Sequence, residues 1–411
     1  MNTLSKENIL LLAVMLLSSF GAFSYFPYVS TALVDYLGLS NFSVPTVIAF
    51  GMFAGNTLAY IVCLCVKESA IKPALWMGYA MALLAVASMA LAKFMPAAPA
   101  CAIVAGSILL YRFAIGLSAN LSRSLQMRFL PRREEKLRIF SYIKLCSSIA
   151  GALGPLAGSL VMRTWGFSGV IALSCACFSC ALLLLTFVQR APNATSGIGP
   201  VRNSSWWATL RSQPSMVYAI ASTALLHYIF EAQIYASISL NIQHNEKNYV
   251  DLIALLFASN SLLLIVFVIP ILKLVNASTN KFPTIAIGSF MSVLAIVGSS
   301  FAHSPLAIVL IAALFTVGEI ITPQVMLDMA TAGEQPHNAV GAVATFNFLT
   351  SGIGMSTGFW LGGVLPALNR PLLASAVWIV IYLAFLAMAR YCTLRNSRGW
   401  AAHAVPTLSG S

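Results

Sequence analysis

Charged side chains are scarce in this sequence: only 8% of its 411 residues are Asp, Glu, Lys or Arg, while 59% are hydrophobic. A soluble globular domain carries about 25% charged residues, because most of its surface faces water. A chain with so little charge cannot cover a water-facing surface. The composition therefore excludes a soluble globular protein and makes the lipid bilayer the main solvent of this chain.

Other absences exclude several kinds of site. The eight cysteines lie almost entirely within apolar runs, where thiols pack as small apolar groups. The closest approach to metal-ligand spacing, CACFSC at 175–180, has no nearby His or acid, and the five histidines fall on separate segments. No phosphate-binding loop or nucleophile elbow occurs. The sequence predicts no metal, no cofactor and no enzymatic activity, so an integral membrane enzyme is disfavoured.

Long apolar runs dominate what is present. A helix that crosses the hydrocarbon core needs about 20 apolar residues. The alternating segments of about 10 residues that are typical of closed barrels do not appear. Cutting the chain at charges and at Pro, Gly, Asn and Ser clusters predicts an all-α integral membrane protein with twelve transmembrane helices, near 9–34, 44–66, 73–95, 100–122, 139–162, 168–189, 215–240, 250–273, 282–302, 305–328, 338–365 and 371–391.

The basic residues predict the orientation. Cytoplasmic loops of membrane proteins carry an excess of Lys and Arg. With a cytoplasmic amino terminus, all but six of the 23 basic residues fall on the inside; two lie within spans, and the four outside are Lys93, Arg163, Lys247 and Arg370. We therefore expect a multi-pass protein of a bacterial-type inner (plasma) membrane with both termini cytoplasmic. The same asymmetry explains the net charge of +12 without a nucleic-acid partner.

Two distant stretches of the chain align with later stretches at the same shift of 204 positions. Residues 55–90 can be laid beside 259–298, and residues 152–161 beside 356–365. One shift in two separate places indicates an internal duplication. The matched pairs are Asn56 with Asn260, Gly154 with Gly358, and Gly158 with Gly362.

The duplication predicts the domain organisation. Two pseudo-symmetric six-helix halves would occupy 1–189 and 215–391, and the polar segment 190–214 would be a cytoplasmic linker between them. Residues 392–411 would form a cytoplasmic tail. Transporters built from such repeats bind substrate near the bilayer midplane, between the repeats.

Twelve spans, cytoplasmic ends and a duplication of six helices resemble the major facilitator superfamily. IAGALGPLAGSLV (149–161) resembles the helix 5 motif of its drug/proton antiporter branch, and LLYRFAIGLSAN (109–120) resembles the helix 4 motif through Arg112 and Gly116. Between helices 2 and 3, CVKESAIKP (65–73) departs from the family pattern. The helix 5 matches are Gly151, Gly154, Pro155 and Gly158.

The resemblance implies a fold and a mechanism. Helices 1, 4, 7 and 10 would line a central cavity, and the two halves would rock around it. The helix 5 glycines would pack against the other half, a feature that the family associates with export. Close packing of ordinary transmembrane helices is the alternative explanation for these small residues.

Acidic residues inside the membrane are the candidate proton sites. Of the eleven acids, only Glu231 and Glu319 lie well within predicted spans, and His227 lies one turn before Glu231. A charge at the bilayer centre costs about 2.5 kcal/mol or more, so it normally faces a cavity or a partner. Burial favours the neutral carboxyl, and His titrates near pH 6.5, at about the operating pH. We predict that Glu231 and Glu319 carry protons and that His227 modulates them; a structural polar contact is the alternative.

Further polar and aromatic residues are candidates for the substrate cavity. Arg112 could hold an acid in its charged form, bind an anionic group of the substrate, or form a structural ion pair. Mixed apolar walls with a few polar groups suit an amphipathic organic ligand. The other candidates are Tyr25, Tyr28, Asn56, Tyr142, Gln233, Tyr235, Asn260, Phe346 and Asn347.

These features together predict a proton-coupled secondary active exporter, an antiporter of small organic compounds such as drugs, siderophores or secondary metabolites, working by alternating access. Its partners would be the substrate, protons and the lipid bilayer, and we expect a monomer. A proton-coupled importer of a metabolite or peptide, a lysolipid flippase and a non-transporting sensor are alternatives on the same fold. The helix 5 motif favours export.

Overall fold

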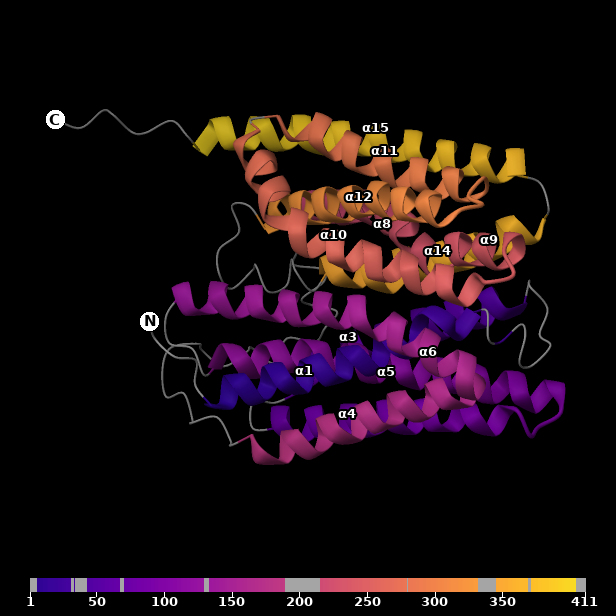
Figure 1. Cartoon of the computed structure of the whole chain (residues 1–411). Helices are drawn as coiled ribbons and strands as arrows, with labels where there is room; N and C mark the ends of the chain where they lie inside the picture. Colours follow the sequence, from indigo (N-terminus) through magenta and orange to yellow (C-terminus); the bar gives the residue numbers. More distant parts are fainter. Residues whose placement is uncertain are drawn as a thin grey trace.

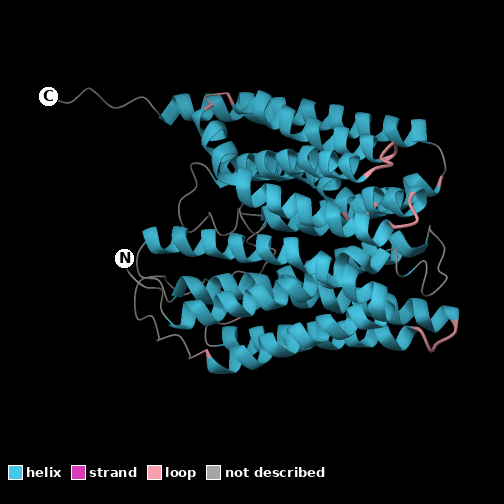
Figure 2. Cartoon of the chain, in the orientation of Figure 1, coloured by secondary structure: helices cyan, strands magenta, loops and turns pink. Residues whose placement is uncertain are grey.

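The computed structural model describes residues 6–30, 33, 43–66, 70–128, 133–188, 215–278, 280–331, 345–368 and 371–403. Every regular element in these ranges is a helix (Figure 2). The first helix begins and the last helix ends on the same side of the molecule (Figure 1), which we call the terminal end. The other side is the opposite end. The predicted all-helical class is confirmed.

The first part of the chain forms the indigo-to-magenta group of helices in Figure 1. Its elements are α1 (Lys6–Tyr25), the 3-10 turn η1 (Phe26–Tyr28), α3 (Ser43–Cys65), α4 (Ile71–Ala92), α5 (Ala97–Arg128) and α6 (Arg133–Phe187). α6 crosses the molecule twice, because Gly166 interrupts it with φ 63° and ψ −165°. This left-handed φ favours glycine. The interruption separates the predicted helices 139–162 and 168–189.

The second part of the chain forms the other group, coloured from pink through orange to yellow in Figure 1. Its elements are α8 (Ser215–Glu231), the 3-10 turn η3 (Ala232–Ile234), α9 (Ser237–Asn245), α10 (Tyr249–Ala277), α11 (Lys281–Ser299), α12 (Pro305–Thr331), the π-helix η4 (Phe348–Gly354), α14 (Met355–Ala367) and α15 (Pro371–His403).

The number of crossings agrees with the sequence. Ten segments of the described chain are long and apolar enough to cross a membrane. One of them, 145–187, contains the interruption at Gly166 and so crosses twice. The predicted seventh span is divided between α8 and α9 and adds a further crossing. The architecture is consistent with the twelve predicted helices.

Several helices extend past their predicted ends. α5 continues to Arg128 and α6 begins at Arg133, so most of the stretch 123–138, between the predicted spans 100–122 and 139–162, is helical. α15 continues to His403 and takes in much of the predicted tail 392–411. Apolar runs end where the hydrocarbon ends, whereas Arg, Lys and Glu continue a helix readily outside it. The predicted linker 190–214 lies outside the described residues.

The seventh span is not the continuous helix predicted over 215–240. α8 ends at Glu231, and Ala236 leaves helical geometry with φ −114° and ψ −93°. Side chains satisfy backbone carbonyls around the break, since Gln233 Nε2 donates to Ile229 O (2.6 Å) and Ser239 Oγ donates to Ile234 O (2.7 Å). Such replacements allow a helix to be broken at membrane depth. Glu231 therefore occupies a helix end.

The glycines of α6 correct the expectation drawn from the resemblance. A Cβ on Gly154 would lie 2.9 Å from Phe23 Cβ, and one on Gly158 would collide with Ser24 O, so both glycines face α1 in the same half. Of the helix 5 glycines, Gly151 is the one that faces the other half, where its Cβ would lie 2.5 Å from Ser261 Oγ on α10. The patch mainly closes the first half on itself.

The second half repeats this contact. A Cβ on Gly358 would lie 2.6 Å from Ile229 O of α8, and one on Gly362 would collide with Gln233 Oε1. A hydrogen bond joins the paired helices in each half: Tyr28 Oη donates to Pro155 O (2.6 Å), and Gln233 Nε2 donates to Gly358 O (2.9 Å). The shift of 204 positions thus matches residues with equivalent packing.

Candidate functional site

A cavity of about 210 Å³ lies between the two groups of helices. Its walls come from α1 and α6 of the first half and from α8, α10, α12 and α14 of the second half, with residues next to η3. A site lined from both halves is where a rocking transporter exposes substrate to each side in turn. The lining residues are Phe23, Ser147, Ser148, Glu231, Ile234, Tyr235, Phe257, Asn260, Ser261, Leu264, Phe315, Glu319 and Met355.

The two acids singled out by the sequence meet in this cavity. Glu231 is the last residue of α8, Glu319 lies within α12, and both side chains are partly exposed. Asn260 of α10 donates from Nδ2 to Glu319 Oε2 (3.0 Å) and to Thr316 Oγ1 (3.1 Å). The Glu319 carboxylate is therefore held in place by an amide while it remains open to the cavity.

Tyr235 connects these acids to a basic residue of the first half. It interacts electrostatically with Glu319, Arg112 and Glu231. Its ring centroid lies 5.0 Å from that of Phe257 and 5.4 Å from that of Phe26. Two carboxyl groups and one guanidinium are thus arranged around one tyrosine at the boundary between the halves.

Arg112 of α5 contacts an aromatic ring. Its guanidinium carbon lies 3.8 Å from the centroid of the Phe26 ring, a cation–π contact. Among the described residues, Arg112 forms no ion pair with an acid within 4.0 Å, and its buried Nε has no hydrogen-bond partner. The described residues therefore do not form the structural ion pair that the sequence suggested as an alternative for Arg112. Arg112, predicted as a cavity residue, is not among the residues that line the cavity.

His227 lies outside the cavity. Its side chain is 1% exposed, and its Nδ1 lies 3.0 Å from Ser289 Oγ of α11. Its ring centroid lies 6.1 Å from that of Phe385 of α15. Four residues turn a helix about 40° past one full turn, and Glu231 also sits at the helix end. The structure thus places His227 in the core of the second half and Glu231 in the cavity.

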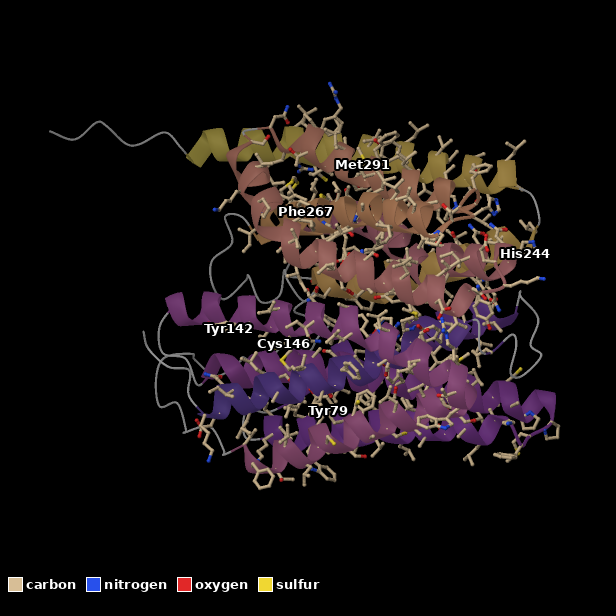
Figure 3. The ribbon with its side chains drawn as sticks, viewed as in Figure 1. Tyr79, Tyr142, Cys146, His244, Phe267 and Met291 are labelled. Atoms are coloured by element: carbon tan, nitrogen blue, oxygen red, sulfur yellow. The ribbon has the colours of Figure 1, made fainter. Side chains whose placement is uncertain are left out.

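The remaining predicted cavity residues divide into two sets. Tyr235 and Asn260 line the cavity, and Asn56 instead donates from Nδ2 to Ser351 O of η4 (2.9 Å) across the two halves. Tyr142 lies on α6 where this helix borders the second half (Figure 3). Those not among the lining residues are Tyr25, Tyr28, Asn56, Tyr142, Gln233, Phe346 and Asn347, of which Tyr25, Tyr28, Gln233 and Phe346 are buried in the helix packing.

Several lining residues were missed by the sequence reasoning. Ser147 and Ser148 of α6 and Ser261 of α10 supply polar groups, and aromatic rings come from α1, α10 and α12. Adjacent serines in an apolar span, and a serine beside Asn260, were a usable signal for a polar face. The aromatic residues carry no such signal, because Phe is as common in lipid-facing positions. The missed rings are Phe23, Phe257 and Phe315.

A second contact joins the halves near the opposite end. Arg163 of α6 forms an ion pair with Asp251 of α10, and Ser159 Oγ donates to Asp251 Oδ1 (3.0 Å). This contact joins α6 to α10, and the bond from Asn56 to Ser351 joins α3 to η4.

Comparisons with known proteins agree with this architecture. A family model described as the Major Facilitator Superfamily matches residues 107–359. The nucleoside transporter NupG is 13% identical, with a TM-score of 0.73, over 93% of this chain and 99% of that chain. A POT family transporter in complex with a thioalcohol conjugated peptide is 11% identical, with a TM-score of 0.76, over 94% and 96% of the two chains.

At these identities the solved structures show a shared fold, and a comparison with curated proteins finds no match. The family model covers more than half of the 411 residues. From this match, the chain is a membrane transporter rather than an enzyme, and it belongs to the Major Facilitator Superfamily.

Proposed function

We propose that this transporter is a proton-coupled exporter that exchanges small organic compounds for protons by alternating access. The observation that carries the proposal is the meeting of Glu231 and Glu319 in one cavity between the halves. A carboxyl group in a partly dry cavity can exchange a proton when its access to water changes. Two such groups beside one substrate space provide the chemistry that coupling requires.

The cavity walls indicate the kind of compound. Phe257, Phe315 and Leu264 supply apolar surface, while the carboxyl groups and nearby serines supply polar contacts. Sites with mostly apolar walls and a few polar groups suit amphipathic organic ligands. A volume of about 210 Å³ fits a small compound in this conformation.

The cycle follows from the positions of these groups. Protonation of a carboxyl removes a negative charge from the cavity, and loss of the proton restores it. Substrate and proton then bind in turn to the same carboxyl groups as the halves rock. Exchange of substrate for protons requires this alternation. The contacts of Asp251 with Arg163 and Ser159 must open when the opposite end of the cavity is exposed.

Export is the direction indicated by the resemblance of 149–161 to the antiporter motif. The packing of Gly154 and Gly158 against α1 recurs in Gly358 and Gly362, so close packing within each half also accounts for these glycines. The direction therefore needs its own test. In a symporter, the same carboxyl groups would carry protons in the same direction as the substrate.

We further propose a monomer in a bacterial-type inner membrane, with both termini in the cytoplasm. The excess of basic residues on one side of the predicted spans supports this orientation. The halves 1–189 and 215–391, with the linker 190–214, follow from the shift of 204 positions.

The test uses purified protein in liposomes with a pH-sensitive dye trapped inside. Candidate amphipathic compounds are added outside after a proton gradient is imposed. We expect wild type to give compound-dependent proton movement, opposite in direction to the movement of the compound. Movement in the same direction would support the importer. Glu231→Gln and Glu319→Gln should impair the flux; wild-type flux in both variants would overturn the proton-site assignment.

A further inference from the structure

The two asparagines matched by the duplication have different partners. Asn56 of α3 donates from Nδ2 to the backbone oxygen of Ser351, in the opposite half (2.9 Å). Asn260 of α10 donates from Nδ2 to Glu319 Oε2, in its own half (3.0 Å). A duplicated structure with equivalent packing would be expected to repeat the first bond. The difference needs a local cause.

The shift of 204 positions identifies the missing bond. It relates Asn56 to Asn260 and Ser351 to Ser147, so the counterpart of the observed bond would join Asn260 to the backbone oxygen of Ser147. Ser147 and Asn260 already line the same cavity from opposite halves. α6 and α10 also approach each other closely next to this pair, since a Cβ on Gly151 would lie 2.5 Å from Ser261 Oγ.

Asn260 Nδ2 donates to Thr316 Oγ1 (3.1 Å) as well as to Glu319, and of these two local partners the acid is the one whose strength as an acceptor can change with protonation. The same shift relates Glu319 to Ile115, an apolar residue, so Asn56 has no competing carboxylate at this position. Hydrogen bonds to an ionised carboxylate are roughly twice as strong as bonds between neutral groups. The carboxylate of Glu319 therefore holds an amide that in the first half is free to bridge the halves.

We propose that Asn260 is a positioning residue that couples protonation of Glu319 to contact between the halves, by moving its amide from the Glu319 carboxylate to the backbone oxygen of Ser147. This inference rests on the proposed proton coupling and adds its transmission step. A neutral Glu319 carboxyl is a weaker acceptor, so the amide turns to Ser147 and draws α10 towards α6. Loss of the proton reverses the exchange.

The other charged and titratable groups around Glu319 define the controls. Glu231 of α8 and Tyr235, after η3, line the same cavity as Glu319, and Tyr235 also interacts electrostatically with Arg112. The lining residues from α1, α6, α10 and α14 carry no titratable group among the described residues. Protonation of Glu231 is therefore the alternative trigger for a change at this interface.

The test measures the separation of α6 and α10 by electron dipolar spectroscopy in lipid nanodiscs, without substrate. Spin labels at Leu145→Cys and Phe267→Cys are suitable, because both native side chains are exposed. They are introduced in a background in which the native cysteines are replaced by serine and which retains wild-type proton flux. Figure 3 marks Cys146 and Phe267 on the two helices concerned. The full chain is titrated from alkaline to acidic pH.

We expect acid to raise the ratio of short to long distances by about tenfold in wild type, the size expected when one hydrogen bond to a charged group is exchanged. Glu319→Gln, which mimics the neutral acid, should fix the short state at every pH. Asn260→Ala should fix the long state at every pH. Asn260→Leu, similar in size and unable to donate, serves as a second variant if Asn260→Ala does not fold.

Asn56→Ala is the matched control, because it removes the equivalent bond where no acid competes. It should loosen the α3 interface while leaving the pH response at α6 and α10 intact. A pH response that survives unchanged in both Asn260 variants would overturn the switch alone. A response retained in Glu319→Gln and lost in Glu231→Gln would also overturn it. Absence of any pH response in wild type would overturn the switch and count against proton coupling itself.

Discussion

The two halves of this transporter share their packing and differ in their chemistry. Gly154 against α1 and Gly358 against α8 repeat one close contact, and a hydrogen bond to a backbone oxygen accompanies it in each half. The acids of the cavity, in contrast, both come from the second half. The two halves thus repeat how their helices approach one another, whereas the two acids that line the cavity lie in one of them.

The clearest example of the difference is the position of Glu319. Its counterpart under the shift of 204 positions is Ile115, and the asparagine next to each of these positions has a different partner. In the proposed switch, a single acid within a repeated framework changes a structural bond into one that depends on protonation. The account therefore predicts large effects from changes to the acids and smaller effects from changes to the shared packing.

The largest expected effect comes from removing the Glu319 carboxyl group, which has no counterpart in the first half. Glu319→Gln should reduce compound-dependent proton flux in liposomes to the level of protein-free vesicles, because glutamine keeps the shape and cannot carry the proton. Glu246→Gln is the matched control, since this acid lies at the end of α9, 3.7 Å from His303, and outside the cavity. Equal loss of flux in the two variants would contradict the assignment.

The next effect tests whether the packing is shared. Gly158→Ala and Gly358→Ala should each lower stability by about 1–3 kcal/mol, because the new methyl group meets a backbone oxygen that cannot move aside. Thermal unfolding of the reconstituted protein measures the loss. Gly106→Ala and Gly298→Ala are the matched controls, one in each half, because nothing lies within 4 Å of a Cβ there.

These control substitutions should raise stability by up to about 1 kcal/mol, since alanine favours a helix more than glycine does. Loss of stability in Gly158→Ala without loss in Gly358→Ala would show that the repeated contact is not equivalent in the two halves.

A smaller effect tests the difference between two residues of α8, the buried His227 and the cavity residue Glu231. His227 is buried and paired with Ser289, so His227→Phe should change stability by only about 1 kcal/mol and leave the pH dependence of proton flux as in wild type. Ser289→Ala removes the same contact from the other side and should act alike. A displaced pH profile in His227→Phe alone would restore His227 to the modulating role that the sequence suggested.

The smallest effect concerns the contact near the opposite end. Arg163 and Asp251 have side chains that are 58% and 37% exposed, and ion pairs of this kind contribute at most about 1 kcal/mol. Arg163→Ala should therefore lower the melting temperature only slightly, with a similar result for Asp251→Asn. A large loss in either variant would show that this contact, rather than the cavity, dominates the interface between the halves.

Much of the fold and part of the site followed from the sequence. The cost of charge in a bilayer singled out Glu231 and Glu319, and hydrophobic length placed the spans. What could not be predicted is the rotation of each helix about its own axis. That rotation decides that His227 faces Ser289, that Gly154 faces α1, and that Ser147 enters the cavity.

The break after Glu231 was missed for a related reason. No proline or glycine lies between residues 215 and 245, so the sequence offers no local signal for an interruption. The break depends on side chains that bond backbone oxygens: Gln233 reaches Ile229 and Gly358, and Ser239 reaches Ile234. These side-chain bonds can be seen only in the folded structure, where Gln233 also reaches Gly358 of the neighbouring helix α14.

The most direct measurement of the central claim is the infrared difference spectrum of the reconstituted protein between alkaline and acidic pH. The account predicts that acid produces a band from a neutral carboxyl group in a partly dry site, and that Glu319→Gln removes this band while Glu246→Gln retains it. A band that persists unchanged in both Glu319→Gln and Glu231→Gln would contradict the claim that this cavity takes up the proton.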